Sequence, residues 1–164
     1  MSRATPLLLA LCLTTLATLI ACGKQGDADD GKPAAAAADD DALTPFQLEN
    51  GIGPLTEAVT LPAEVDPAMA AAGKAVFEQK CSACHKMKEK YVGPALGEVT
   101  TRRTPTFVMN MILDPQENIE RHPVVKQLVQ ETMSFMANQG LTQEQARQVL
   151  EYLRTQSQST GAPK

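Results

Sequence analysis

From residue 67 onward, apolar residues recur three and four positions apart, which is the pattern of amphipathic helices. The pattern predicts helices over residues 67–80, 105–113 and 123–132, and a last one that starts after Thr142. Pro67, Pro105 and Pro123 each stand in a first helical turn, where proline is favoured. No stretch alternates convincingly between apolar and polar residues, so the predicted fold class is all-α.

Capping residues locate the starts of two of these helices. Thr104 precedes Pro105 as an N-cap, and the segment from Thr142 to Gln145 has the form of a capping box. The second helix is expected to end at Asp114-Pro115. The residues expected to face the core are Val76, Phe77, Phe107, Val108, Met111, Ile112, Val124, Val125, Leu128, Val129, Ala146, Val149, Leu150 and Leu153.

The first 21 residues have the character of an export signal. Arg3 supplies a positive charge, and Leu7 to Ile20 is an apolar run that is too short to span a bilayer comfortably. The run closes with Leu19-Ile20-Ala21-Cys22, which resembles the lipobox of bacterial lipoproteins. That resemblance implies a signal peptide over 1–21 and lipidation of Cys22, which anchors the chain to a membrane. The alternative is an ordinary signal peptide with a cysteine nearby by chance.

Residues 22–66 differ from the rest of the chain in composition. They hold ten acidic and two basic residues, whereas residues 67–164 hold nine acidic and twelve basic ones. Residues 22–45 have too few large apolar groups to form a core and are expected to be a flexible acidic tether. Residues 46–66 contain apolar residues among glycines and prolines, and are expected to form an ordered but irregular extension. Residues 67–164 form the predicted helical domain.

Two cysteines remain once Cys12 is removed with the signal and Cys22 takes lipid. They form Cys81-Ser82-Ala83-Cys84-His85, the pattern of covalent haem attachment. Two thiols three positions apart can each add to one vinyl group of the same porphyrin, and His85 then offers an imidazole to the iron. A zinc site would need two more ligands, and a thiol-redox pair would usually lie in a mixed α/β pattern.

At these residues the chain resembles the class I cytochromes c, over nearly all of residues 67–156. Gly73 and Phe77 match a glycine and an aromatic residue on the family's first helix, and Tyr152 matches an aromatic residue on its last. Gly93-Pro94-Ala95-Leu96 matches a Gly-Pro-x-Leu segment. The resemblance implies a bundle of short helices around one covalent haem c. It also implies that the Pro94 carbonyl accepts a hydrogen bond from His85 and that Leu96 lies against the haem.

The resemblance also implies a methionine as the sixth iron ligand, in the loop before the last helix. Met136 occupies that place, but Ala137 stands where proline is customary, so Met133 remains an alternative. Met109 and Met111 read as core residues. His122, followed by proline, is expected at the surface rather than as a second histidine ligand.

A haem iron with histidine and methionine ligands suits an electron carrier rather than an enzyme. We therefore expect a single-electron carrier in the bacterial envelope, lipid-anchored, with its haem domain in the periplasm. The expected partners are a membrane respiratory complex and a terminal reductase or oxidase; no nucleic acid is expected. Basic residues near the motif would steer an acidic partner: Lys86, Lys88, Lys90, Arg102 and Arg103. One of the arginines could instead bind a haem propionate. The alternatives are a haem enzyme or gas sensor with an open distal site, and a fixed subunit of a larger oxidoreductase.

Overall fold

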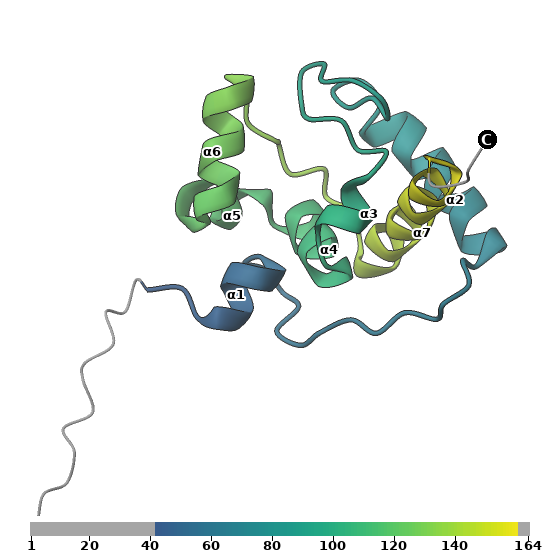
Figure 1. The fold of residues 1–164 in the computed structure, drawn as a ribbon, viewed down its shortest axis with the longest axis horizontal. Coiled ribbons are helices and arrows are strands. Elements are labelled where there is room, and N and C mark those ends of the chain that lie inside the picture. The colour runs from purple at the N-terminus through teal and green to yellow at the C-terminus, as the bar shows by residue number, and fades with distance from the viewer. Residues whose placement is uncertain (1–41, 161–164) are drawn as a thin grey trace, which may run out of the picture. The chain divides into compact units, whose positions relative to one another are not determined.

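The computed structural model describes residues 42–160, which form helices joined by irregular segments (Figure 1). The helices are α1 (Pro45–Asn50), α2 (Pro67–Lys80), α3 (Val99–Arg102), α4 (Pro105–Leu113), α5 (Pro115–Arg121), α6 (Pro123–Thr132) and α7 (Gln143–Thr160). No strand occurs within residues 42–160, so the predicted all-α class is confirmed for this part of the chain. The predicted signal peptide over 1–21, Cys22 and residues 22–41 of the tether predicted over 22–45 lie outside the described residues.

Proline starts most of these helices, and a side chain just before it usually caps the first turn. Asp66 accepts hydrogen bonds from the amides of Ala68 and Met69, and Thr104 accepts one from Phe107. Asp114 ends α4 and also caps α5, whose first residue is Pro115. The expected stop at Asp114-Pro115 is therefore correct. The same two residues also start α5, which was not predicted, and neither was α3. The predicted capping box is present, with Thr142 and Gln145 bonded reciprocally.

The core of the domain is the crossing of α2 and α7, which lie against each other in Figure 1. At the crossing the rings of Phe77 and Tyr152 are 5.3 Å apart between centroids. Gly73 allows the close approach, because a Cβ there would lie 1.9 Å from the carbonyl oxygen of Gln148. Helix α4 completes the core, whose buried apolar cluster consists of Phe77, Val108, Met109, Ile112, Ala146, Val149, Leu150 and Leu153.

The extension before the domain is ordered, but it does not begin irregularly as expected. Residues 45–50 form α1, because Thr44 and Gln47 make a capping box around Pro45. The rest of the extension, residues 51–66, follows an irregular course from α1 to α2, and we call it the strap.

The strap is held by buried polar side chains of α4 and α5. Each accepts a hydrogen bond from a strap amide. The side-chain amides also donate: Asn110 to the carbonyls of Leu55 and of Asn50, the last residue of α1, and Asn118 to the carbonyl of Ile52. The pairs are Ile52–Asn118, Leu55–Asn110 and Val59–Thr106, at 2.8, 3.0 and 2.8 Å. These three side chains are at most 1% exposed, so the bonds replace those that the backbone of an irregular segment would otherwise make with water.

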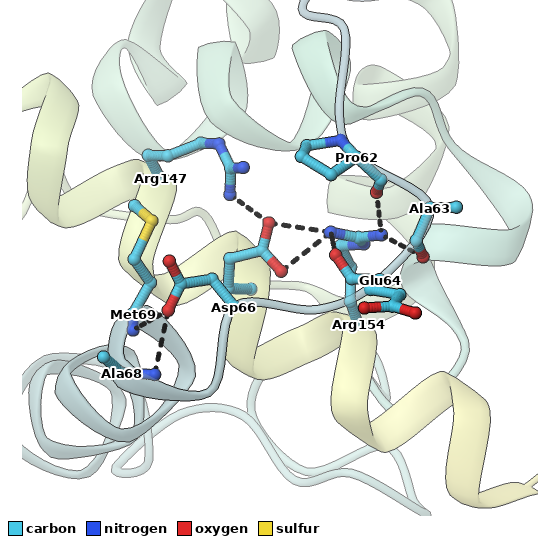
Figure 2. Close-up of polar contacts among 9 residues, drawn as sticks. Pro62, Ala63, Glu64, Asp66, Ala68, Met69, Arg147 and Arg154 are labelled. Atoms are coloured by element: carbon cyan, nitrogen blue, oxygen red, sulfur yellow. Dashed lines mark hydrogen bonds and ion pairs between the residues drawn. The ribbon is translucent and has the colours of Figure 1, made fainter.

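The C-terminal end of the strap is fastened to α7 by an ion-pair network (Figure 2). Glu151 is fully buried and is paired with Arg147 one turn before it and with Arg154 one turn after it. Arg154 faces Glu151 with its Nη1. Its Nη2 donates to the carbonyls of Pro62 and Ala63, at 2.7 and 3.0 Å. The buried charge on Glu151 thus orients Arg154, which in turn holds the strap.

His122 corrects one expectation. It was expected at the surface, but it is 1% exposed, because its ring packs edge-on against Phe107 and bonds to the Leu48 carbonyl at 3.1 Å. Burial was also overestimated on α6, where Val125 is buried but Val124, Leu128 and Val129 are only half-buried.

Among the described residues, no helix has the length and apolar character needed to cross a membrane.

Candidate functional site

The Cys81–His85 motif begins where α2 ends. The amides of Cys84 and His85 both donate to the Cys81 carbonyl, at 3.1 and 2.9 Å, so the motif turns tightly after the helix. Cys81 is half-buried and Cys84 is exposed, and both are free thiols that line one cavity. The sequence motif therefore folds into a compact turn with its three functional side chains on the cavity.

The imidazole of His85 is held by the loop that follows it. Its Nδ1 lies 3.0 Å from the Pro94 carbonyl, so Nδ1–H is the donor and the lone pair of Nε2 is left for a metal. The contact expected from the Gly-Pro-x-Leu resemblance is thus present. Gly93 makes it possible, because a Cβ at this position would lie 2.4 Å from the imidazole ring. Leu96 lines the cavity beside His85.

The cavity has a volume of about 450 Å³, within the range of small-molecule and cofactor sites. Its wall is formed by the end of α2, the loop from Cys81 to Leu96, the helices α3 to α6, the segment before α7 and part of α7, and it is mainly apolar. The apolar side chains that line it include Phe107, Met111, Ile112, Ile119, Val125, Leu128, Val129 and Phe135. The polar side chains that line it include Lys80, Lys90, Arg102, Arg103, Glu131, Thr132, Ser134 and Gln139. A large, mainly apolar group fits such a wall.

The two candidate methionines lie in different places. Met136 is half-buried and lines the cavity together with His85. Met133 ends α6 in the left-handed region, with φ of 53°, is 88% exposed and does not line the cavity. The structure therefore brings Met136, and not Met133, to the same cavity as His85.

The competing thiol chemistries fit poorly. Burial, with a smaller contribution from the charge of Cys84, raises the pKa of the Cys81 thiol to about 11. Reactive redox and metal-binding cysteines instead need a lowered thiol pKa. No cluster of three or more His, Cys, Asp or Glu side chains able to hold a metal ion occurs among residues that the structure describes.

Basic residues lie around the cavity, but several are engaged. Lys86 donates to the Ser82 carbonyl at 2.8 Å, with its Nζ 4.9 Å from the Tyr91 ring. Arg102 donates to the Ala95 carbonyl, and the guanidinium of Arg103 lies 5.1 Å from the Phe107 ring. Of the predicted basic residues, Lys90, Arg102 and Arg103 line the cavity.

The strap does not take part in this site: none of the described residues of 46–66 lines the cavity. It packs instead on the faces of α4 and α5 that carry Asn110 and Asn118. Sequence reasoning missed these two asparagines and Glu151. For Glu151 a signal existed, since Arg147 and Arg154 stand four before it and three after it, at helical spacing.

Comparison with known proteins gives a family and two similar solved structures. Residues 70–157 match the family model for cytochrome c. A solved cytochrome c from Rhodothermus marinus is 45% identical and superposes with a TM-score of 0.66, covering 71% of this chain and 99% of its own. An engineered form of that protein bound to a carbene intermediate matches with 45% identity and a TM-score of 0.63, over 70% of this chain and 99% of its own. The comparison with curated proteins gave no match.

Proposed function

Because the chain belongs to the cytochrome c family and so carries a covalently bound c-type haem, we propose that it is a single-electron carrier. Cys81 and Cys84 would hold the haem through thioether bonds, and His85 and Met136 would bind its iron. The bound haem supplies a reversible one-electron couple at iron. The protein's own residues supply ligands, orientation and a dry apolar wall.

The observation that carries the proposal is that His85 and Met136 line the same apolar cavity, which Met133 does not. A thioether opposite an imidazole favours the reduced iron and raises its potential. The hydrogen bond from His85 to Pro94 sets the tautomer in which Nε2 is free for iron. An iron filled on both sides has no position for a substrate, which suits a carrier rather than an enzyme.

The test is the optical spectrum of protein made with c-type haem maturation machinery, oxidised, reduced, and reduced under carbon monoxide. A methionine–iron charge-transfer band in the oxidised protein and slow or absent carbon monoxide binding are expected. A c-type haem that lacks the band and binds carbon monoxide at once would contradict the closed site and favour gas or peroxide chemistry. Absence of covalent haem would contradict the assignment of Cys81 and Cys84.

The proposed partners are a membrane respiratory complex on one side and a terminal reductase or oxidase on the other. Support comes from the basic residues next to the site, of which Lys88, Lys90 and Arg102 are exposed. Opposite charges speed encounter and are screened by salt. Electron transfer to such a partner should therefore slow as ionic strength rises. A stable co-purifying partner with salt-insensitive transfer would favour the fixed-subunit alternative.

The proposed location is the bacterial cell envelope, with Cys22 lipidated and the haem domain in the periplasm. Support comes from the lipobox-like Leu19–Cys22 segment at the end of the predicted export signal. The c-type haem of the family agrees with a location outside the cytoplasm. Replacing Cys22 with serine should release the full-length protein from the membrane fraction and abolish labelling by a radioactive fatty acid. Cys12→Ser, inside the signal, is the control and should change neither. An unlabelled wild-type protein would contradict lipidation.

A further inference from the structure

The segment that carries Met136 has no regular secondary structure. It begins after Thr132, the last residue of α6, and ends before Gln143, the first residue of α7. Segments of this kind open with little free energy, unless they are held by contacts to neighbouring elements. Ala137 follows the methionine where a stiffer proline would restrict the chain. Contacts from outside the segment therefore decide how firmly Met136 is held.

One contact holds the upstream end of the segment across the cavity. Lys90, in the loop between His85 and Gly93, donates from Nζ to the carbonyl of Glu131 at 2.5 Å. Both residues line the cavity, so the bond joins the loop on the His85 side to the end of α6. The Glu131 carbonyl is among the last of that helix, where a cation is favoured by the negative end of the helix dipole.

A second contact holds the segment just past Met136. The side-chain amide of Asn138 donates from Nδ2 to the carbonyl of Leu113 at 3.2 Å. Leu113 is the last residue of α4, so the bond also satisfies a carbonyl at a helix end. The Oδ1 of the same amide accepts from the backbone of Gly140 at 2.8 Å, which shapes the turn into α7.

We propose that Lys90 and Asn138 are positioning residues that together keep Met136 in the cavity, in the role that proline would otherwise serve. Met136 lies five residues after Glu131 and two before Asn138, between the two contacts. The loss of either contact raises the fraction of molecules in which the segment has opened. This inference rests on the proposed function, since it requires Met136 to be the sixth ligand.

The chain offers matched controls for both residues. Lys88→Ala removes the same charge as Lys90→Ala from the same loop, and Lys88 makes no hydrogen bond or ion pair with α6 among the described residues. Gln116→Ala removes an exposed side-chain amide that bonds to Glu120 within α5 and does not line the cavity. Two further variants separate the bonds: Lys90→Arg can still donate to Glu131, whereas Asn138→Asp can accept from Gly140 but cannot donate to Leu113.

The experiment measures carbon monoxide binding to the reduced holoprotein by stopped flow, because carbon monoxide binds iron only after the methionine has left. Each of Lys90→Ala and Asn138→Ala should raise the rate limited by methionine departure by about three- to tenfold, the size expected for loss of one hydrogen bond. Asn138→Asp should behave as Asn138→Ala does, and Lys90→Arg should restore the wild-type rate. The control variants should stay within about twofold of wild type.

Global unfolding of each variant, followed by circular dichroism, separates positioning from general stability. A loss of stability with unchanged carbon monoxide binding would overturn the proposal. The proposal would also be overturned if carbon monoxide bound at the same rate to each alanine variant and to its control variant. A Met136→Ala variant that keeps the methionine–iron band would also overturn it, and would place the fault in the ligand assignment rather than in the contacts.

Discussion

Gly73 and Gln148 touch where α2 crosses α7: a Cβ on Gly73 would lie 1.9 Å from the Gln148 carbonyl oxygen and 2.8 Å from the amide nitrogen of Val149. Both obstacles are backbone atoms of a helix, which cannot turn aside as a side chain can. The whole domain is built on this crossing, since Phe77 and Tyr152 pack one turn along it.

The first prediction follows from that crossing. Gly73→Ala should lower the free energy of unfolding by about 3 kcal/mol, because the helices must separate to admit the methyl group. Denaturant titration of the holoprotein measures the change. Ala71→Ser, exposed on the same helix, should change stability by less than about 0.5 kcal/mol. Equal effects of the two variants would contradict the close approach.

The second prediction concerns the sixth ligand. Met136→Ala should abolish the methionine–iron charge-transfer band of the oxidised protein and lower its reduction potential, because the thioether stabilises Fe(II). Met133→Ala should leave band and potential unchanged, since Met133 is 88% exposed and off the cavity. Loss of the band in Met133→Ala, with an unchanged band in Met136→Ala, would identify Met133 as the sixth ligand.

The third prediction concerns the network around Glu151. Arg154→Ala should destabilise the protein by about 3 kcal/mol, because it leaves a fully buried carboxylate with one partner and frees the strap carbonyls. Hydrogen exchange should then rise in the strap. Lys74→Ala breaks a pair whose side chains are about 60% exposed and should cost less than about 0.5 kcal/mol. Strap exchange that stays at the wild-type rate would contradict the role given to Arg154.

The fourth prediction concerns acid stability. Burial lowers the pKa of His122 from its usual 6.5; the Leu48 carbonyl opposes the shift and nearby Arg103 adds to it. The neutral ring donates from Nε2, while buried Nδ1 has no hydrogen-bond partner in the part of the chain that the structure describes. Protonation would add an N–H and a charge to a ring that is 1% exposed, and the backbone carbonyls of Leu48 and Gln47 offset only part of that cost.

The sign follows from proton counting. Below pH 6.5 the unfolded chain binds a proton at this histidine and the folded chain does not. The contribution of the neutral ring to the free energy of unfolding is therefore fully present above pH 6.5. It falls as the pH drops toward the lowered pKa, by at most about 1.4 kcal/mol per pH unit. His122→Gln can still donate to Leu48 but does not titrate. Its unfolding free energy should vary less between pH 7 and pH 5 than that of the wild type; an unchanged slope would show that His122 does not contribute.

Much of the architecture was predictable from local chemistry. Proline in a first turn, a capping threonine or aspartate and apolar residues at helical spacing located α2, α4, α6 and α7, because these signals act within a few residues. The Cys81–His85 motif and Gly93–Leu96 were readable for the same reason: attachment and ligand support depend on short spacings along the chain.

What the sequence could not determine depends on contacts between distant residues. His122 followed by proline looks like a surface residue until Phe107 and Leu48 cover it. Asn110, Asn118 and Glu151 look like solvated polar residues until the strap and the two arginines supply partners for them. Met133 and Met136 are three residues apart and equal in chemistry, and only the left-handed end of α6 turns one outward while the other lines the cavity. Spacing along the chain determined the helices and the motif, whereas burial and partner choice were decided by tertiary packing, because both depend on which distant surfaces meet.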